Sequence, residues 1–268
     1  MSIIIFISNI TMIKFKYEDV HAMDKIKQLQ KMIEESNNIV VFSGAGVSTE
    51  SGLKDFRSKD GLYNQKNELP AEYLLSSDCF YNNPDLFYNY YKNNLNSLSV
   101  KPNITHIFLK RLEDSGKLKA IITQNIDGLH SRAGNKKVFE IHGSTYKNHC
   151  IICNKEYSAE FVFNSKGKPM CTCGGLIKPD VVLYGEALPE NEFNGAIKSI
   201  QNADMMLVIG TSLTVSPANS MVSIFKGNNL VIINNDATPY DYIADLVIHQ
   251  KLSTVFTPLM ENMNFELK

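Results

Sequence analysis

The chain has 268 residues, a formal net charge of -1 at pH 7, and 44% hydrophobic against 21% charged residues. This composition is that of a folded globular protein and excludes an intrinsically disordered chain. A net charge so close to zero gives no general attraction to nucleic acid or to an anionic membrane surface. No apolar run approaches the roughly eighteen residues that a membrane-spanning helix needs. We therefore expect neither nucleic acid nor a membrane as a partner.

The first 22 residues differ from those that follow. They contain an isoleucine-rich stretch, but no basic leader precedes it and no small-residue cleavage site follows it, so a signal peptide is not expected. From Met23 onwards, apolar residues recur with helical spacing at Ile26, Leu29 and Ile33. We expect residues 1–22 to be a disordered or dispensable extension, and the folded chain to begin with a helix at Met23.

A glycine-rich turn follows the first predicted strand. Residues 39–42 are β-branched or aromatic, which is typical of a buried strand, and they run into Gly44-Ala45-Gly46. Glycine has no Cβ, so the backbone can approach a ligand closely there, and a following helix would offer its first N–H groups to a phosphate. The dinucleotide fingerprint has a third glycine where Thr49 stands, and similar turns occur in proteins that bind no nucleotide. The polar residues after the turn favour a pyrophosphate-binding loop: Ser48, Asp55 and Arg57.

Further apolar runs alternate with helical stretches, which is typical of an α/β protein with a doubly wound parallel, Rossmann-like sheet. We assign residues 23–143 and 177–268 to this domain, with a helical insertion at about 60–98 that Pro70 and Pro84 interrupt. Most aromatic rings of the insertion are expected to pack in its core. The further strands are predicted at residues 118–123, 138–141, 205–209, 230–233 and 246–248.

Polar residues stand directly after these strands. Because the carboxyl ends of parallel strands form the ligand-binding edge of an open α/β sheet, we expect these side chains to line one crevice. They are Gln124, Asn125 and Asp127, then His142, then Gly210, Thr211 and Ser212, and finally Asn234 and Asn235.

The cysteines indicate a small metal module at residues 144–176. Two pairs are separated by 17 residues, which fits four thiolate ligands around one structural zinc ion. The second pair is Cys-x-Cys rather than the usual Cys-x-x-Cys, His149 is a competing ligand, and a redox-active dithiol is the alternative. Reduced thiols and the missing secretory signal favour the cytoplasm. The predicted zinc ligands are Cys150, Cys153, Cys171 and Cys173.

Taken together, the motifs of this chain resemble those of the sirtuin family. They occur in the family's order and with its spacing over about residues 38–248. The resemblance implies an NAD-dependent protein-lysine deacylase with a Rossmann domain, a small zinc lobe and a helical module. The motifs are Gly44-Ala45-Gly46-Val47-Ser48, Asp55-Phe56-Arg57, residues 123–130, His142-Gly143, the four cysteines, residues 178–186 and Gly210-Thr211-Ser212-Leu213.

The resemblance also implies roles for individual residues. His142 would be the general base, and Asn125 and Asp127 would line the nicotinamide and its ribose as further catalytic residues. The residues expected to bind NAD are Gly44, Ala45, Gly46, Ser48, Asp55, Phe56, Arg57, Gln124, Asn125, Asp127, Gly210, Thr211, Ser212, Asn234 and Asn235.

These residue types suit the chemistry. Cleavage of the nicotinamide–ribose bond builds positive charge on the sugar, and a pocket that Phe56 shields from water favours attack by the acyl oxygen over hydrolysis. A ribose hydroxyl must then be activated by a base with a pKa near neutrality, which favours histidine. The expected outcome is transfer of the acetyl group to ADP-ribose with release of nicotinamide.

Acetylated-lysine proteins or peptides are the partners that the resemblance implies. The peptide would add as a strand between residues 181–185 and 215–217. Sirtuins that prefer acidic acyl groups carry Tyr-x-x-Arg, and the corresponding residues are identified as Tyr91 and Asn94. Without that guanidinium a succinyl carboxylate would be buried unpaired, so we expect acetyl or other neutral acyl groups. The expected substrate-binding residues are Val181, Val182, Leu183, Tyr184, Gly185 and Tyr91.

Other functions stay open on the sequence alone. A mono-ADP-ribosyltransferase would cleave NAD in the same way but pass the sugar to a protein side chain, and a deacylase for longer neutral acyl groups would share the whole site. A catalytically idle NAD-sensing or zinc-dependent binding module is a third possibility. An NAD(P)H oxidoreductase is a fourth, although no acid can be assigned to the adenosine ribose. We expect the protein to be a monomer.

Overall fold

The computed structural model describes residues 23–58, 61–64, 68–263 and 265. The extension expected at residues 1–22 therefore lies outside the described residues. The first described segment is a helix over residues 23–35, as the apolar spacing from Met23 predicts. Within the described part of the chain, no helix is long and apolar enough to cross a membrane.

In the described part of the chain, the central sheet consists of six strands that all run parallel. They are β1 (Ile39–Ser43), β2 (Leu118–Thr123), β3 (Val138–Glu140), β7 (Met205–Ile209), β8 (Asn229–Ile233) and β9 (Leu246–Ile248). Each lies within one residue of its predicted bounds, and the predicted doubly wound sheet is confirmed. The order across the sheet is β3-β2-β1-β7-β8-β9, so the direction of winding reverses between β1 and β7. Open α/β sheets bind their ligands at such a reversal.

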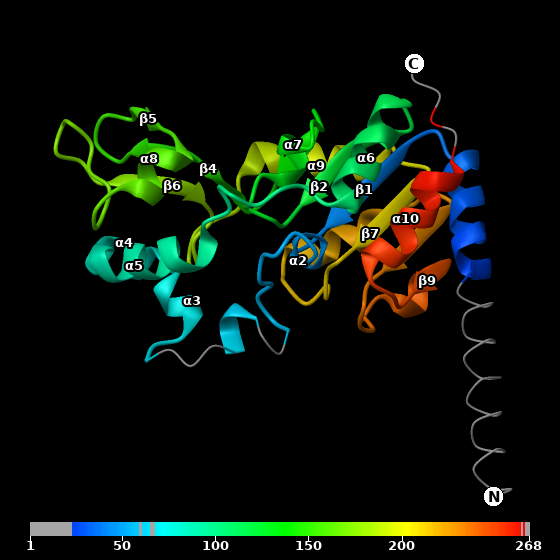
Figure 1. The fold of residues 1–268 in the computed structure, drawn as a ribbon, viewed down its shortest axis with the longest axis horizontal. Coiled ribbons are helices and arrows are strands. Elements are labelled where there is room, and N and C mark those ends of the chain that lie inside the picture. The colour runs from blue at the N-terminus through cyan, green and yellow to red at the C-terminus, as the bar shows by residue number, and fades with distance from the viewer. Residues whose placement is uncertain (1–22, 59–60, 65–67, 264, 266–268) are drawn as a thin grey trace, which may run out of the picture.

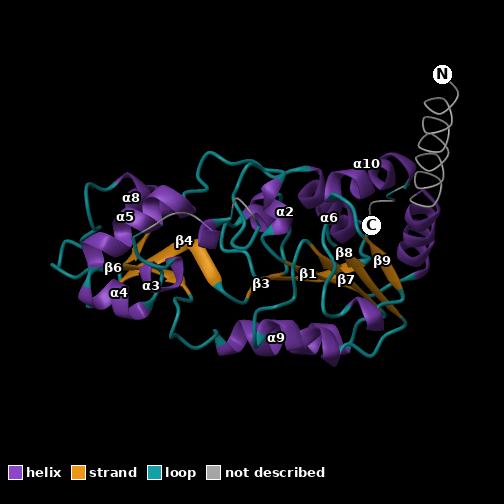
Figure 2. Cartoon of the chain, turned by 90° about the horizontal axis from the view of Figure 1, so that it is seen from below, coloured by secondary structure: helices purple, strands orange, loops and turns teal. Residues whose placement is uncertain are grey.

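Helices cover both faces of the central sheet. Figure 2 shows α6 (Ile104–Asp114) and α10 (Leu252–Asn262) on one side and α9 (Glu190–Gln201) on the other. Successive side chains of β1 point to opposite faces. Val41 packs in the same apolar cluster as Phe108 and Phe256, whereas Phe42 packs in the cluster of Ile200. This two-sided burial explains why the strands read as continuous apolar runs in the sequence.

A three-stranded antiparallel sheet forms a separate lobe beside the central sheet (Figure 1). Its strands are β4 (Gly143–Cys150), β5 (Glu156–Tyr157) and β6 (Ile177–Val181), in the order β5-β4-β6, and α8 (Ala159–Asn164) accompanies them. Because β6 pairs with β4, the small sheet extends to residue 181, past the end at residue 176 that we expected for the zinc module. The domain boundaries themselves stay a prediction.

The helical insertion packs against this lobe. Its described residues form a 3₁₀ turn, η1 (Leu62–Asn64), and the helices α3 (Ala71–Leu74), α4 (Ser77–Asn82) and α5 (Pro84–Leu95). Pro70 directly precedes α3 and Pro84 is the first residue of α5, so both prolines stand where a helix tolerates them. The ring of Tyr91 in α5 stacks on that of Phe163 in α8, with 5.3 Å between their centroids. Aromatic stacking thus joins the insertion to the small lobe.

Candidate functional site

A cavity of about 580 Å³ lies between the carboxyl ends of the central strands and the segment that follows β6. This volume falls in the range of about 300–1,000 Å³ that is typical of small-molecule sites. Most of the residues singled out in the sequence line this one cavity. They are Gly44, Ala45, Gly46, Asp55, Phe56, Arg57, Tyr91, Gln124, Asn125, His142, Val181, Val182, Leu183, Tyr184, Gly185, Gly210, Thr211, Ser212 and Asn234.

Three predicted residues lie outside the cavity lining. Asn235 is exposed after β8. Ser48 and Asp127 are buried behind the lining, where Ser48 Oγ donates a hydrogen bond of 2.7 Å to Asp127 Oδ2. Asn125, which does line the cavity, donates from Nδ2 to Ser48 Oγ over 3.2 Å. Ser48 and Asp127 are thus positioned to hold Asn125 in place.

The lining also includes residues to which the sequence assigned no role. Ile126 is an apolar residue within the polar segment after β2, and no sequence pattern indicates a function for it. Leu75 and Leu95 come from the helical insertion, and no sequence pattern separates them from its other apolar residues. The further lining residues are Ser58, Tyr63, Glu186, Ala187, Leu188 and Asp236.

The glycines of the first turn are required by packing inside the protein. A Cβ on Gly46 would lie 2.8 Å from the carbonyl oxygen of Gly210, and one on Gly44 would lie 2.7 Å from Cβ of Thr211. The Gly46 amide donates to the Gly210 carbonyl over 2.8 Å. The missing Cβ atoms therefore let the turn after β1 touch the turn after β7. The following helix, α2 (Gly46–Thr49), has only four residues.

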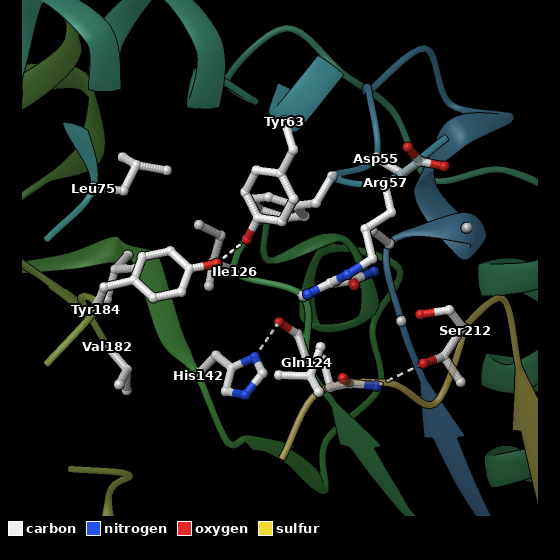
Figure 3. A pocket seen from close by; sticks show the side chains of 18 of the residues that line it. Asp55, Arg57, Tyr63, Leu75, Gln124, Ile126, His142, Val182, Tyr184 and Ser212 are labelled. Atoms are coloured by element: carbon white, nitrogen blue, oxygen red, sulfur yellow. Dashed lines mark hydrogen bonds between the residues drawn. The ribbon is translucent and has the colours of Figure 1, made fainter. Parts of the chain in front are cut away.

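His142 follows β3 and lines the cavity (Figure 3). Its Nδ1 lies 3.1 Å from the main-chain oxygen of Gln124. A carbonyl oxygen can only accept a hydrogen bond, so Nδ1 carries the hydrogen and Nε2 keeps its lone pair. Burial lowers the pKa of His142, the Gln124 carbonyl partly opposes this, and the positive charge of Arg57 lowers the pKa further. The imidazole is thus neutral and able to accept a proton at neutral pH.

The polar segment after β2 is tied to its neighbours on both sides. The Gln124 side chain donates to Thr211 Oγ1 over 3.0 Å, which links it to the turn after β7. Asp127 accepts a second hydrogen bond of 2.9 Å from the Leu129 amide. Burial raises the pKa of Asp127, and the hydrogen bonds from Leu129 and Ser48 lower it in part.

Two aromatic rings lie close to Arg57. The rings of Phe56 and Tyr63 are 5.5 Å apart at their centroids, and the Arg57 guanidinium carbon lies 5.2 Å from the centre of the Tyr63 ring. The hydroxyl of Tyr63 contacts that of Tyr184 (Figure 3), and both tyrosines line the cavity. The 3₁₀ turn η1 and the segment after β6 thus touch through two tyrosines.

The predicted peptide edge at residues 181–185 is already partly paired. The Tyr184 amide donates to the Leu75 carbonyl over 3.1 Å, and the Ser77 amide donates to the Tyr184 carbonyl over 3.0 Å. Residues 215–217, the other side of the predicted peptide channel, line the same cavity. Residues 186–188 line it as well, so the edge that faces the cavity continues beyond Gly185.

The four predicted metal ligands meet in the small lobe. The sulfur atoms of Cys150, Cys153, Cys171 and Cys173 all lie within 4.8 Å of one another. Tetrahedral zinc with Zn–S bonds of about 2.3 Å needs sulfurs about 3.8 Å apart, so the set fits one zinc ion. His149 instead pairs with Asp180. A Cβ on Gly175 would lie 2.5 Å from the Cys150 sulfur, so only glycine fits beside the cluster.

A doubly wound parallel sheet, a four-cysteine lobe and a cavity at the switch point define a two-lobed α/β protein with a dinucleotide-type site. Residues 44–217, more than half of the chain, match the model of the Sir2 family. The chain belongs to the Sir2 family, the sirtuins, as the sequence motifs predicted.

Curated relatives and solved structures agree with this assignment. The chain is 50% identical over 242 residues to an NAD-dependent protein deacetylase of Clostridium perfringens, covering 89% of this chain and 99% of the relative. It is 46% identical over 228 residues to a protein of the same name from Cutibacterium acnes, covering 84% and 93%. A Sir2 structure with a deacetylated p53 peptide and 3'-O-acetyl ADP-ribose has a TM-score of 0.83 and 37% identity, covering 90% of this chain and 99% of that chain. A Sir2 complex with p53 peptide and NAD⁺ has a TM-score of 0.79 and 39% identity, covering 88% and 97%.

Proposed function

We propose that this protein is an NAD-dependent protein-lysine deacetylase. Acetyl-lysine, NAD and one water would give the free lysine amine, nicotinamide and acetyl-ADP-ribose. The observation that carries the proposal is His142, whose Nδ1 is held by the Gln124 carbonyl while Nε2 stays available beside the glycine turn in one cavity. The relatives named NAD-dependent protein deacetylase support the same reaction.

The cavity suits a bound NAD. Its lining offers the glycine turn, the Arg57 guanidinium and the Ser212 hydroxyl for the phosphates, and Asn234 for the adenosine ribose. Gln124 accepts a hydrogen bond from His142 at its main-chain oxygen, and Asn125 is the next residue of the lining. The side chains of Gln124 and Asn125 would face the nicotinamide and its ribose. When bound, NAD supplies the labile nicotinamide–ribose bond whose cleavage drives the transfer.

The residues around that bond have separate tasks. Phe56 and Tyr63 line the cavity and would exclude water from it, which favours attack by the acyl oxygen over hydrolysis. His142 would then take the proton of a ribose hydroxyl at Nε2. Asn125 is a catalytic residue in this proposal. Ser48 and Asp127 lie behind the cavity wall, and Ser48 holds the Asn125 amide through a hydrogen bond.

The acyl group is expected to be neutral. Asn94 donates its Nδ2 to the Tyr90 carbonyl over 2.9 Å and does not line the cavity. The ammonium of Lys92 is directed at Ser165 and Gly167 in the small lobe. Neither side chain is positioned to pair with a carboxylate on the acyl chain, which supports acetyl over succinyl.

The zinc ion is expected to be structural. Four thiolates would complete its tetrahedron and leave no coordination position for water, so the metal would hold the lobe together without taking part in the reaction. Thiolate ligands must be reduced, which supports the cytoplasm as the protein's location.

The test is nicotinamide release from NAD, measured with and without an acetyl-lysine peptide. The wild type should release nicotinamide only with peptide, and should give deacetylated peptide in equal amount. His142→Ala should lose deacetylation at least a hundredfold, within the range of about 10²–10⁴ for a general base. Arg111→Ala is the control for a surface substitution, because Arg111 is exposed on α6 and lies outside the cavity. Label from NAD left on protein would instead indicate an ADP-ribosyltransferase, and NAD binding without nicotinamide release would indicate a sensing module.

A further inference from the structure

We propose that the ion pair of Lys178 and Glu186 positions the segment along which an acyl-lysine peptide binds, and thereby sets the affinity for the peptide without affecting that for NAD. The segment consists of residues 181–188, which all line the cavity, and is called the peptide edge below. The inference rests on the proposed deacylase function and concerns the same site. Lys178 and Glu186 are positioning residues in it, because they act through the peptide edge and not on the reacting atoms.

The peptide edge forms a wall between two cavities. The residues that line both the candidate site and a second cavity of about 280 Å³ are Val181, Val182, Glu186 and Ala187. Lys178 lines the second cavity. Leu183 is buried, whereas residues 184–188 are half-buried or exposed. Apolar packing therefore fixes the beginning of the peptide edge, and polar contacts have to fix the remainder.

The ammonium group of Lys178 is directed at the peptide edge. Its side chain is only 10% exposed, and Nζ donates to Glu186 Oε2 over 3.1 Å. The same Nζ donates to the main-chain oxygens of Pro179 over 3.2 Å and Val181 over 3.3 Å. An ammonium group has three hydrogens, so these acceptors use all of them. A buried charge is tolerated only when it is paired in this way, which makes Glu186 the partner on which Lys178 depends.

Glu186 closes a turn within the peptide edge. Its main-chain amide donates to the Leu183 carbonyl over 2.9 Å, and its carboxylate accepts the Leu183 amide over 2.9 Å. Gly185, the third residue of this four-residue turn, has a φ of +92°, the sign that a type II turn requires there. The oxygen that accepts the Leu183 amide is also the one that accepts Lys178. The ion pair therefore fastens the closed turn to β6.

The candidate base and the expected NAD site have supports apart from the ion pair. The Val182 amide donates to the His142 carbonyl over 2.9 Å, and the Tyr184 amide donates to the Leu75 carbonyl over 3.1 Å. Figure 3 shows Val182 and Tyr184 on the opposite side of the site from Ser212, where the phosphates of NAD are expected. Loss of the ion pair should thus free the turn of the peptide edge while His142 and the NAD site stay in place. The effect should appear in the KM for the peptide and not in kcat or in NAD binding.

The experiment measures kcat and KM for an acetyl-lysine peptide at saturating NAD, and the dissociation constant of NAD by calorimetry without peptide. Lys178→Met and Glu186→Ala should each raise the KM for the peptide about tenfold, because each removes one partner of a buried, charged hydrogen bond. Neither variant should change kcat by more than about twofold or alter the dissociation constant of NAD. Lys147→Met is the matched control, because Lys147 lines the second cavity and pairs over 3.0 Å with Glu140 instead of the peptide edge. It should keep the wild-type KM.

Two further variants separate the charge of Glu186 from its part in the turn. Glu186→Gln keeps an oxygen that can accept the Leu183 amide but loses the charge, so its KM should rise less than that of Glu186→Ala. The double variant Lys178→Met/Glu186→Gln leaves neither charge buried without its partner. It should therefore have a lower KM for the peptide than Lys178→Met alone.

The outcomes separate the inference from the function on which it rests. An unchanged KM for the peptide in Glu186→Ala would overturn the inference and leave the deacetylase intact. This arm holds even if Lys178→Met does not fold, because the Glu186 side chain is 25% exposed and is the less buried of the pair. NAD binding weakened as much as peptide use would also overturn it, since the ion pair would then support the fold in general. A wild type that deacetylates no peptide would overturn the proposed function and, with it, the inference.

Discussion

Ser48 Oγ donates a hydrogen bond of 2.7 Å to the buried carboxylate of Asp127, across 79 positions of sequence. The same hydroxyl accepts the Asn125 amide over 3.2 Å. Ser48 comes from the helix after the glycine turn, and the other two residues follow β2. One serine therefore joins the expected phosphate-binding loop to the expected nicotinamide pocket.

Removing that hydroxyl should destabilise the protein in a pH-dependent manner. Ser48→Ala takes a donor from a buried carboxylate, and we expect a loss of about 1.5–3 kcal/mol in the free energy of unfolding at pH 7. Burial holds the folded pKa of Asp127 above its unfolded value of about 3.9, so ionisation of Asp127 costs stability as the pH rises through the folded pKa. Ser48 reduces that cost. The loss in Ser48→Ala should thus be largest at neutral pH and shrink as the pH is lowered.

Urea unfolding of Ser48→Ala at several pH values between 4 and 7 measures this effect. Thr49→Ala is the control, because Thr49 is exposed and its hydroxyl only donates to the Gly46 carbonyl. A loss in Ser48→Ala that does not change with pH would contradict a role for the Asp127 charge.

The pKa of His142 should respond to Arg57. Burial is the largest cause of the lowered pKa, and the Arg57 charge acts in the same direction. Arg57→Gln removes that charge, so His142 should titrate at a higher pH in the variant than in the wild type. In the wild type, His142 should stay neutral to a lower pH than an ordinary histidine, whose pKa is about 6.5. The fall of kcat/KM on the acid side should therefore also occur below that pH.

An NMR titration of His142 in both proteins tests this without turnover, with the signal assigned by its loss in His142→Ala. Arg111→Gln, an exposed change on α6, should leave the titration where it is. An identical midpoint in Arg57→Gln would show that the two charges do not interact.

One zinc ion per chain is expected, and its loss should unfold the small lobe. Cys171→Ala removes one of the four thiolates and should reduce bound zinc from one equivalent to nearly none. Cys79→Ala is the matched control, because Cys79 is a buried cysteine outside the cluster and should keep one equivalent. Atomic absorption of the purified proteins measures the metal. Full zinc content in Cys171→Ala would rule out the four-cysteine site.

The central sheet could be predicted from the sequence because its strands are buried on both faces. Residues 39–43 and 205–209 are buried throughout, so every position is apolar or small, and a strand is visible without any knowledge of its neighbours. The four cysteines were equally visible, since a zinc site constrains residue type and local spacing. Both features can be recognised from residue types and spacings within short stretches of the chain.

The small sheet and the inner contacts of the site could not be predicted in this way. β4 alternates buried and exposed positions irregularly, and its pairing with β6 shifts in register between Ser144 and Asn148, so no period identifies it. The contact of Tyr63 with Tyr184 joins residues 121 positions apart. Leu75 and Leu95 line the cavity although they come from the helical insertion, which packs against the small lobe. Such contacts depend on tertiary packing, which single-sequence patterns do not carry.

The close approach of Gly46 to Gly210 should make Gly46 irreplaceable. In Gly46→Ala the new Cβ would lie 2.8 Å from the Gly210 carbonyl oxygen and 2.9 Å from Gly210 Cα, and backbone atoms cannot move aside cheaply. We expect a loss of about 1–3 kcal/mol in the free energy of unfolding, as for other overpacked sites, together with weaker NAD binding. Gly52→Ala is the control, because a Cβ there meets no atom within 4 Å and only the positive φ of +95° is unfavourable. Urea unfolding and calorimetric titration with NAD measure both effects. Wild-type affinity for NAD in Gly46→Ala would show that the turn after β1 does not shape the nucleotide site.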